Sequence, residues 1–252
     1  MAHALRTRFC GDIVSEFLPP KDLSSKEVLI LCDGMPSLPH KKALMSFISK
    51  RNMWVFHPRY RGAWESGGEF LKESPHLDIL DIISELYTKK SVTDLRHGNV
   101  FSIDIERLYV VGGSFGGPAA LFSSLDSRVT KVIARSSVVD WTAPSEKEPM
   151  DELKLMVRNS FGEAYRFSDK NWDRLSRGEI YNPVNHIEEF DGSKIHMIHA
   201  KDDAVVSYDP VASFANMIGA TLKTYNTGGH LSSGILMKFL ESRRMLKFLR
   251  SK

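Results

Sequence analysis

The chain has 252 residues, 42% of them hydrophobic and 26% charged, which is enough for one α/β domain, residues 1–252, with a single core. The formal net charge is +3 at pH 7 and the basic residues are dispersed, so the composition does not favour nucleic acid as a partner. The two cysteines, Cys10 and Cys32, make no disulfide framework and are typical of a reducing compartment.

The first 18 residues contain four charged side chains among the apolar ones, so we expect no signal peptide. No later segment approaches the length of a membrane span. We therefore predict a cytoplasmic protein that has no membrane partner. The sequence leaves the oligomeric state open.

Short apolar, β-branched runs alternate with helical patterns along the chain. Residues 8–18 are strand-like and end at two prolines, so we expect them to start an antiparallel edge. Later runs predict strands at 27–31, 53–56, 107–111, 131–135, 194–199 and 221–225. Helices are expected at 40–50, 75–89, 118–125, 210–218 and 232–249. This alternation favours a mostly parallel central sheet with helices on both faces.

The basic C-terminal stretch, 241–252, is interpreted as part of a closing helix packed on the sheet, and contact with an anionic membrane is the alternative.

Residues 143–191 break the alternation because they are polar and carry their aromatic side chains on expected short helices. An insertion there would lie over the carboxyl ends of the strands, where ligands bind in open α/β sheets. We interpret it as a small lid insertion rather than a separate domain. The alternative is a surface excursion without a role in substrate binding.

The most informative motif is Gly-x-Ser-x-Gly at Gly112, Ser114 and Gly116, where the predicted strand 107–111 runs into a predicted helix. The glycines permit a turn so tight that other side chains would clash, and the turn presents the serine hydroxyl above the sheet. This context is that of the nucleophile elbow of a serine hydrolase. The segment lacks the lysine and the glycine spacing of a phosphate-binding loop.

A serine nucleophile needs a histidine that takes its proton and an acid behind that histidine. On sheets with such an elbow, the acid follows a late strand and the histidine follows the last one. Asp202 and Asp203 follow the strand 194–199, and His230 follows the strand 221–225 after two glycines. Position alone leaves both aspartates as candidates for the acid.

An oxyanion hole requires two N–H donors, and the N–H of Phe115, directly after the serine, supplies one. We expect the second from the loop after the strand 27–31, and we propose the Met35 N–H, with Gly34 allowing the backbone to approach the substrate. A shift of the register by one residue, or a plain Gly-Pro turn, is the alternative. The histidine positions indicate no metal site, and no cofactor is expected.

With these residues the chain resembles the α/β-hydrolases, and more narrowly the catalytic domain of the prolyl oligopeptidase (S9) family of serine peptidases. The resemblance extends over nearly the whole chain. It is carried by the Gly-Gly-Ser-Phe-Gly-Gly elbow, by Tyr60-Arg-Gly62, by the Asn-Pro-Val-Asn-His-Ile segment at 182–187 and by residues 199–206. The last segment is similar to the pattern His-Gly-x-x-Asp-x-x-Val, which favours Asp203 over Asp202 as the acid.

The chain differs from that family because it has no room for a β-propeller and because Asp33 stands where many hydrolases have a histidine before Gly34. The loop also offers no tyrosine hydroxyl for the oxyanion hole. Arg59, Arg61 and Glu65 are expected either to bind a charged substrate end or to brace their loop by salt bridges.

The resemblance implies acyl transfer to water, and we predict a hydrolase that cleaves a small ester, or an activated amide or short peptide. A prolyl oligopeptidase-like peptidase, a non-catalytic ligand receptor and an acyltransferase or lyase are the alternatives.

Overall fold

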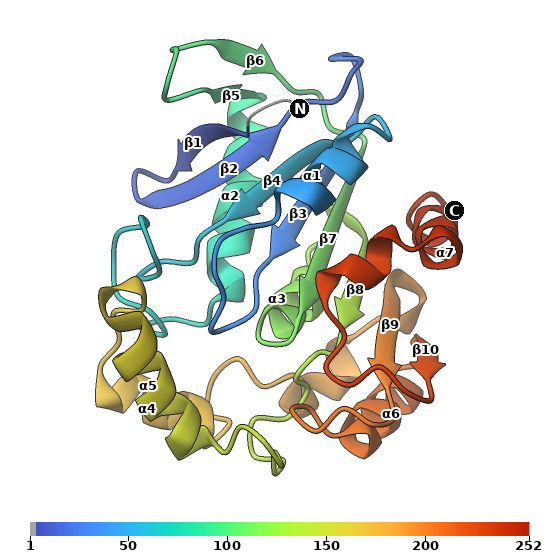
Figure 1. Cartoon of the computed structure of the whole chain (residues 1–252). Coiled ribbons are helices and arrows are strands. Elements are labelled where there is room, and N and C mark those ends of the chain that lie inside the picture. Colours follow the sequence, from blue (N-terminus) through green and yellow to red (C-terminus); the bar gives the residue numbers. More distant parts are fainter. Residues whose placement is uncertain (1–3, 252) are drawn as a thin grey trace.

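The computed structural model describes residues 4–251, whose strands form an eight-stranded sheet and a two-stranded hairpin. The strands of the sheet are β1 (Leu5–Phe9), β2 (Ile13–Leu18), β3 (Glu27–Cys32), β4 (Trp54–Pro58), β7 (Arg107–Gly113), β8 (Val129–Arg135), β9 (Ile195–Ala200) and β10 (Thr221–Tyr225). The hairpin consists of β5 (Ser91–Thr93) and β6 (Val100–Ser102). The strand order in the sheet is β1-β2-β4-β3-β7-β8-β9-β10 (Figure 1). β2 pairs antiparallel with β1 and β4, and all other neighbours in the sheet are parallel.

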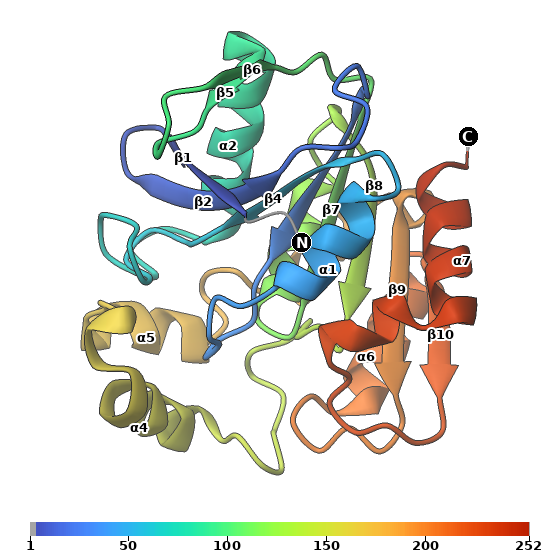
Figure 2. The same cartoon turned by 45° about the horizontal axis from the view of Figure 1, so that its top comes forward.

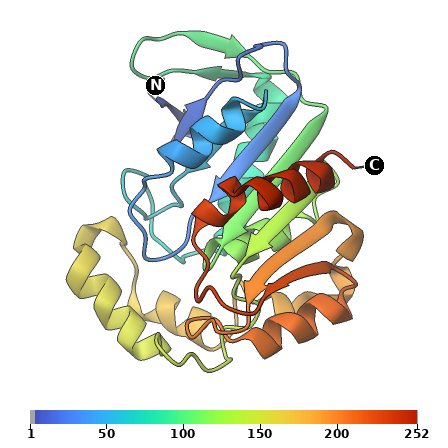
Figure 3. The ribbon, with the colours of Figure 1, turned by 45° about the vertical axis from the view of Figure 1, so that its right-hand side comes forward.

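Helices cover both faces of the sheet. They are α1 (Lys42–Ser49), α2 (His76–Lys89), α3 (Gly116–Ser123), α4 (Met150–Phe161), α5 (Asp169–Ser176), α6 (Tyr208–Met217) and α7 (Phe239–Leu249). In Figure 3, α1 in blue and α7 in red lie in front of the sheet. Short 3₁₀ helices occur at Gly162–Ala164, Pro183–Glu189, Gly192–Lys194 and Ser233–Met237.

Two apolar cores form in place of the single core expected, because successive side chains of a strand point to opposite faces of the sheet. Val28 and Ile30 of β3 belong to a core that includes buried residues of α2, α3 and α6. Leu29 and Leu31 belong to a second core with α1 and α7. Strands buried on both faces are continuously apolar, which is the pattern seen in the sequence. The predicted mostly parallel sheet with helices on both faces is confirmed.

Two of the predicted elements are divided in the structure, and the hairpin of β5 and β6 was not predicted. The segment 8–18, expected as one strand, is part of a hairpin, because the chain turns at Cys10 and Gly11, with φ angles of 50° and 80°. This hairpin is the expected antiparallel edge. The helix expected at 232–249 is divided, because Lys238 has an extended backbone, with ψ 140°, between the 3₁₀ turn Ser233–Met237 and α7.

The segment 143–191 lies at the end of the sheet to which the arrowheads of the parallel strands point (Figures 1 and 2). Two hydrogen bonds join the chain just before this segment to residues near the segment's end. The Trp141 N–H donates to Asn182 Oδ1 at 2.9 Å, and the Val184 N–H donates to the Val139 carbonyl at 2.9 Å. The role of this segment as a lid stays a prediction. Within residues 4–251, no helix has the length and apolar character that crossing a membrane requires.

Candidate active site

Ser114 occupies a strained turn between β7 and α3, with a φ angle of +54°. A Cβ atom on Gly112 would lie 1.9 Å from the Gly116 carbonyl oxygen, and one on Gly116 would lie 2.4 Å from the Cys32 carbonyl oxygen. No side chain fits at such distances, so both glycines of the motif are required by the packing of backbone against backbone. The turn has the geometry expected of a nucleophile elbow.

Ser136, directly after β8, links the elbow to the histidine loop. Its carbonyl oxygen accepts the Ser114 N–H at 3.1 Å, and its hydroxyl accepts the N–H of Leu231 at 3.1 Å. Its own N–H donates to the Ile198 carbonyl on β9 at 2.8 Å. One residue therefore connects three segments that come from distant parts of the sequence. The sequence analysis did not identify Ser136, because these bonds use mainly backbone groups that no side-chain pattern signals.

Asp203 contacts His230 directly. The two carboxylate oxygens lie 3.1 and 3.0 Å from His230 Nδ1. The Asp203 side chain is fully buried, and its Oδ1 also accepts the N–H groups of Val205 and Val206 at 3.0 Å each. Burial opposes ionisation, but His230 and the two N–H donors outweigh it and hold the pKa of Asp203 below its usual range. The carboxylate is therefore charged at neutral pH and can orient the imidazole.

Asp202 has a different position. Its carboxylate accepts the N–H groups of Gly229 at 2.8 Å and Gly228 at 3.1 Å, and these bonds lower its pKa. Both glycines have positive φ angles, 149° at Gly228 and 55° at Gly229, which other residues rarely adopt. Of the two candidate acids, the structure thus brings Asp203 to His230, while Asp202 binds the loop that precedes His230.

His199 contacts the loop that carries Asp203. Its Nε2 lies 2.9 Å from the Val206 carbonyl oxygen and 3.6 Å from Asp203 Oδ2. Burial lowers the pKa of His199, so the ring is neutral and its N–H donates to that carbonyl. The two ends of the predicted pattern, residues 199 and 206, are therefore in contact around the aspartate.

Ser114 and His230 are both half-buried. Within the described part of the chain, no hydrogen bond joins the Ser114 hydroxyl to the imidazole. Bonds between a nucleophile and its base are often long before substrate binds and shorten in the complex.

The two expected oxyanion donors border the serine. Phe115 follows it directly, and the loop containing Met35 approaches it so closely that a Cβ on Gly34 would lie 3.4 Å from Ser114 Cβ. The Gly34 N–H donates to Asp33 Oδ1 at 3.1 Å, whereas in residues 4–251 the N–H groups of Met35 and Phe115 have no acceptor. Both residues line a cavity of about 380 Å³ together with Ser114. Their role in an oxyanion hole remains a prediction.

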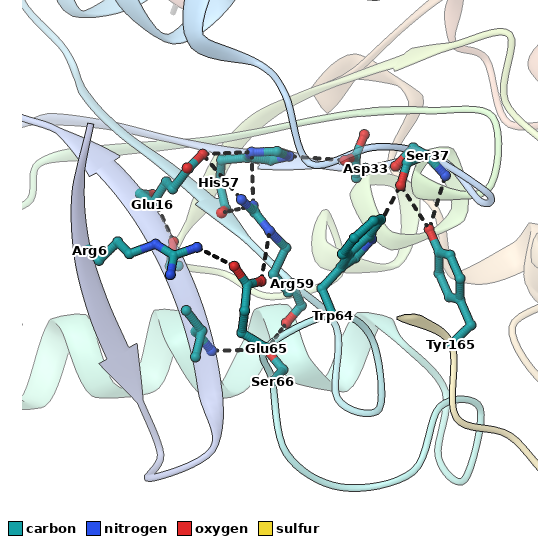
Figure 4. Close-up of polar contacts among 12 residues, drawn as sticks. Arg6, Glu16, Asp33, Ser37, His57, Arg59, Trp64, Glu65, Ser66 and Tyr165 are labelled. Carbon is teal, nitrogen blue, oxygen red and sulfur yellow. Dashed lines mark hydrogen bonds and ion pairs between the residues drawn. The ribbon is translucent and has the colours of Figure 1, made fainter. Parts of the chain in front are cut away.

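A buried polar network holds the loop that carries Met35 (Figure 4). Asp33 pairs with Lys41 Nζ at 2.8 Å and with Nε2 of the fully buried His57 at 3.2 Å. Burial opposes ionisation of Asp33, but His57 and Lys41 hold its pKa far below the usual range. His57 Nδ1 in turn lies 3.0 Å from Arg59 Nη1, and Arg59 Nη2 lies 3.1 Å from Glu16. The network makes Asp33, which replaces the histidine common in hydrolases, an anchor for its loop.

The charged residues near Tyr60 are paired within the protein. Arg59 Nε lies 3.7 Å from Glu65, and Arg61 forms ion pairs of 2.8 Å with Asp12 and 2.7 Å with Asp78. Of the two expectations for these residues, the salt bridges that brace the loop are the one observed. Over residues 4–251, no group of three or more His, Cys, Asp or Glu side chains could hold a metal ion.

No protein-family model matches the sequence, and no curated protein matches it either. Solved structures do match. The esterase Pf2001 of Pyrococcus furiosus superposes with a TM-score of 0.69 at 16% identity, over 98% of this chain and 89% of its own. The alpha/beta hydrolase GrgF from Penicillium sp. sh18 gives 0.65 at 16% identity, over 98% and 97% of the two chains. The chain therefore has the α/β-hydrolase fold.

Within this fold, the chain is similar to the acylaminoacyl peptidase of Pyrococcus horikoshii, with a TM-score of 0.64 at 16% identity. The match covers 98% of this chain but 40% of the peptidase. The predicted resemblance to the catalytic domain of the S9 family is confirmed at the level of the fold.

Proposed function

We propose that this protein is a serine hydrolase that cleaves a small carboxylic ester, or an activated amide or short peptide, through an acyl-enzyme on Ser114. The observation that carries the proposal is the Asp203–His230 pair, tied through Ser136 to a serine on a strained strand-to-helix turn. This constellation is the one that nucleophilic catalysis requires.

In the proposed reaction, His230 Nε2 takes the proton of the Ser114 hydroxyl as the oxygen attacks the carbonyl carbon. Asp203 stays ionised, orients the ring through Nδ1 and stabilises the imidazolium. The N–H groups of Phe115 and Met35 stabilise the oxyanion. His230 then gives its proton to the leaving group, and a water molecule, activated by the same histidine, releases the acid from Ser114.

The cavity beside Ser114 supports a small substrate, because its volume of about 380 Å³ lies at the lower end of the range of ligand pockets. Part of its wall comes from seven residues between Ala143 and Leu153 and from Ser176. We therefore propose that the segment 143–191 is a lid that shapes the substrate site, within one domain.

A peptidase activity is the second candidate. It is favoured by the similarity to acylaminoacyl peptidase, although this chain spans less than half of that protein. Esters lead because they are the more reactive class of acyl compound.

The test is the hydrolysis of p-nitrophenyl esters of increasing acyl length beside aminoacyl and prolyl p-nitroanilides. Ser114→Ala should lower kcat at least about a thousandfold, and Asp203→Asn by a comparable factor. Asp202→Asn is the matched control, since it changes the neighbouring carboxylate that does not contact His230, and its effect should be far smaller.

Turnover of esters alone would make the protein an esterase, and cleavage of the anilides would make it a peptidase. Hydrolysis that does not depend on Ser114 would refute the proposed mechanism. No turnover of either class would refute the proposal and favour a receptor or an acyltransferase.

A further inference from the structure

The cavity beside Ser114 combines apolar walls with a negative charge. Its apolar side chains include Val138, Val139, Trp141, Met150, Leu153 and Val211. Asp140 and Glu148 also line it, and over the described residues no lysine, arginine or histidine does. This is a local excess of acid in a chain whose net charge is +3.

The two acids differ in their contacts. Asp140 Oδ1 accepts both the N–H and the hydroxyl of Thr142, at 2.9 and 2.7 Å. Glu148 is held by its backbone, because its N–H donates to the Ser145 hydroxyl at 3.0 Å. Its carboxylate has neither a hydrogen bond nor an ion pair with any part of residues 4–251. Glu148 therefore offers a free acceptor at the cavity.

The environment of Glu148 makes its charge costly in the absence of a partner. Glu148 is half-buried, and burial raises its pKa. His230 acts in the opposite direction and Asp203 in the same direction as burial. A cation placed against the carboxylate would remove this cost, whereas an anion would increase it.

Glu148 lines the same cavity as the serine nucleophile, so its charge can act on a substrate group bound there. The cavity it lines is the one lined by Ser114 and Phe115, so a group that fills the cavity is attached to the carbonyl that Ser114 attacks. The residue lies just before α4, whose residues Met150 and Leu153 provide apolar wall.

We propose that Glu148 selects substrates whose group in this cavity is apolar along its length and ends in a positive charge, an ammonium or a guanidinium. The inference rests on the proposed function and names its substrate class. The apolar walls bind the hydrocarbon part, and the carboxylate pairs with the charged end. Acyl groups that end in a carboxylate are excluded by repulsion from two acids.

The test compares p-nitrophenyl esters of equal length with ammonium, methyl and carboxylate ends: 6-ammoniohexanoate, heptanoate and the monoester of adipate. For the wild type, kcat/KM should be at least about tenfold higher for the ammonium ester than for heptanoate, and lowest for adipate. Glu148→Gln should bring the ammonium and methyl esters to nearly equal values while retaining the rate on heptanoate. Glu146→Gln, an exposed acid outside the cavity, is the matched control and should keep the preference.

A second measurement does not depend on catalysis. Calorimetric titration of the Ser114→Ala protein should show hexylammonium binding more tightly than 1-hexanol, and Glu148→Gln in that background should remove the difference. The preference for hexylammonium over hexanol should also weaken as the pH is lowered, because protonation removes the charge of Glu148. Since the pKa of Glu148 is raised, this weakening should begin at a higher pH than for an ordinary glutamate.

The outcomes separate the two proposals. The role of Glu148 is overturned, and the proposed function is not, by Ser114-dependent hydrolysis without a preference for the ammonium ester. Equal binding of hexylammonium and hexanol has the same meaning. A Glu148→Gln effect of equal size on all three esters also overturns it, since that pattern means that Glu148 acts on His230 and not on the substrate. Hydrolysis that survives in Ser114→Ala overturns the proposed function, while the titration still decides whether the cavity binds cations.

Discussion

Replacing Glu16 by Gln should lower the free energy of unfolding at neutral pH, because Glu16 is the outer acid of the buried network that ends at Asp33. Its Oε2 lies 3.7 Å from His57 Nδ1 and 3.1 Å from Arg59 Nη2. His57 and Arg59 lower the pKa of Glu16 from 4.5 to about 2, although burial acts in the opposite direction. By linkage, this difference corresponds to about 3 kcal/mol of stabilisation at pH 7.

The sign of the pH dependence follows from the lowered pKa. The stabilisation is fully present above the unfolded value of 4.5 and is lost as the pH falls toward 2. The difference between wild type and Glu16→Gln should therefore shrink from about 3 kcal/mol at pH 7 to about 1 kcal/mol at about pH 3.

Urea unfolding at both pH values measures this difference. The control is Glu106→Gln, which removes an exposed pair with Lys26 of 2.6 Å and should cost less than about 1 kcal/mol. A Glu16→Gln loss below about 0.5 kcal/mol at pH 7, or one that is equal at both pH values, would refute the reasoning.

Two further predictions concern the elbow. Gly116→Ala should abolish ester hydrolysis and lower the melting temperature by several degrees, because its Cβ would lie 2.4 Å from the Cys32 carbonyl oxygen. The control is Gly234→Ala, where the nearest atom is a serine hydroxyl at 3.3 Å. It should change neither the melting temperature nor the rate of hydrolysis. Tyr181→Phe should cost about 1–2 kcal/mol in urea unfolding, because the tyrosine hydroxyl donates to the buried Phe115 carbonyl at 2.7 Å, and an unchanged midpoint would contradict this contact.

Much of the fold could be predicted because its strands are buried on both faces. β3 and β7 are nearly continuous apolar runs, and such runs indicate buried parallel strands. The turn at Cys10 and Gly11 was missed although Gly11 is a signal of a hairpin turn, since the cysteine before it, which also has a positive φ angle, follows no turn preference. The break at Lys238 was missed because lysine is a good helix former and gives no signal of a helix end.

The candidate site shows the same division. Glycine spacing and strand order pointed to Ser114 and His230, because those signals reflect local backbone requirements. Position alone left Asp202 and Asp203 open, and only the resemblance of residues 199–206 to a known pattern favoured Asp203. The loop geometry brings the Asp203 carboxylate to the ring. The unpaired state of Glu148 could not be predicted either, since it depends on which groups surround its carboxylate in space.

The bonds of Ser136 have a consequence for how this fold can vary. The separation between Ser114 and His230 is determined by the register of β7, β8 and β9, and none of these bonds involves the segment 143–191. Residues 142–181 are enclosed by one contact between residues 139–141 and 182–184. The segment also bonds to the elbow through Tyr181 and to the loop of Asp203 through Ser145 and Lys147. A segment of different length or charge that keeps these bonds would therefore alter what enters the cavity while the spacing of serine and histidine stays the same.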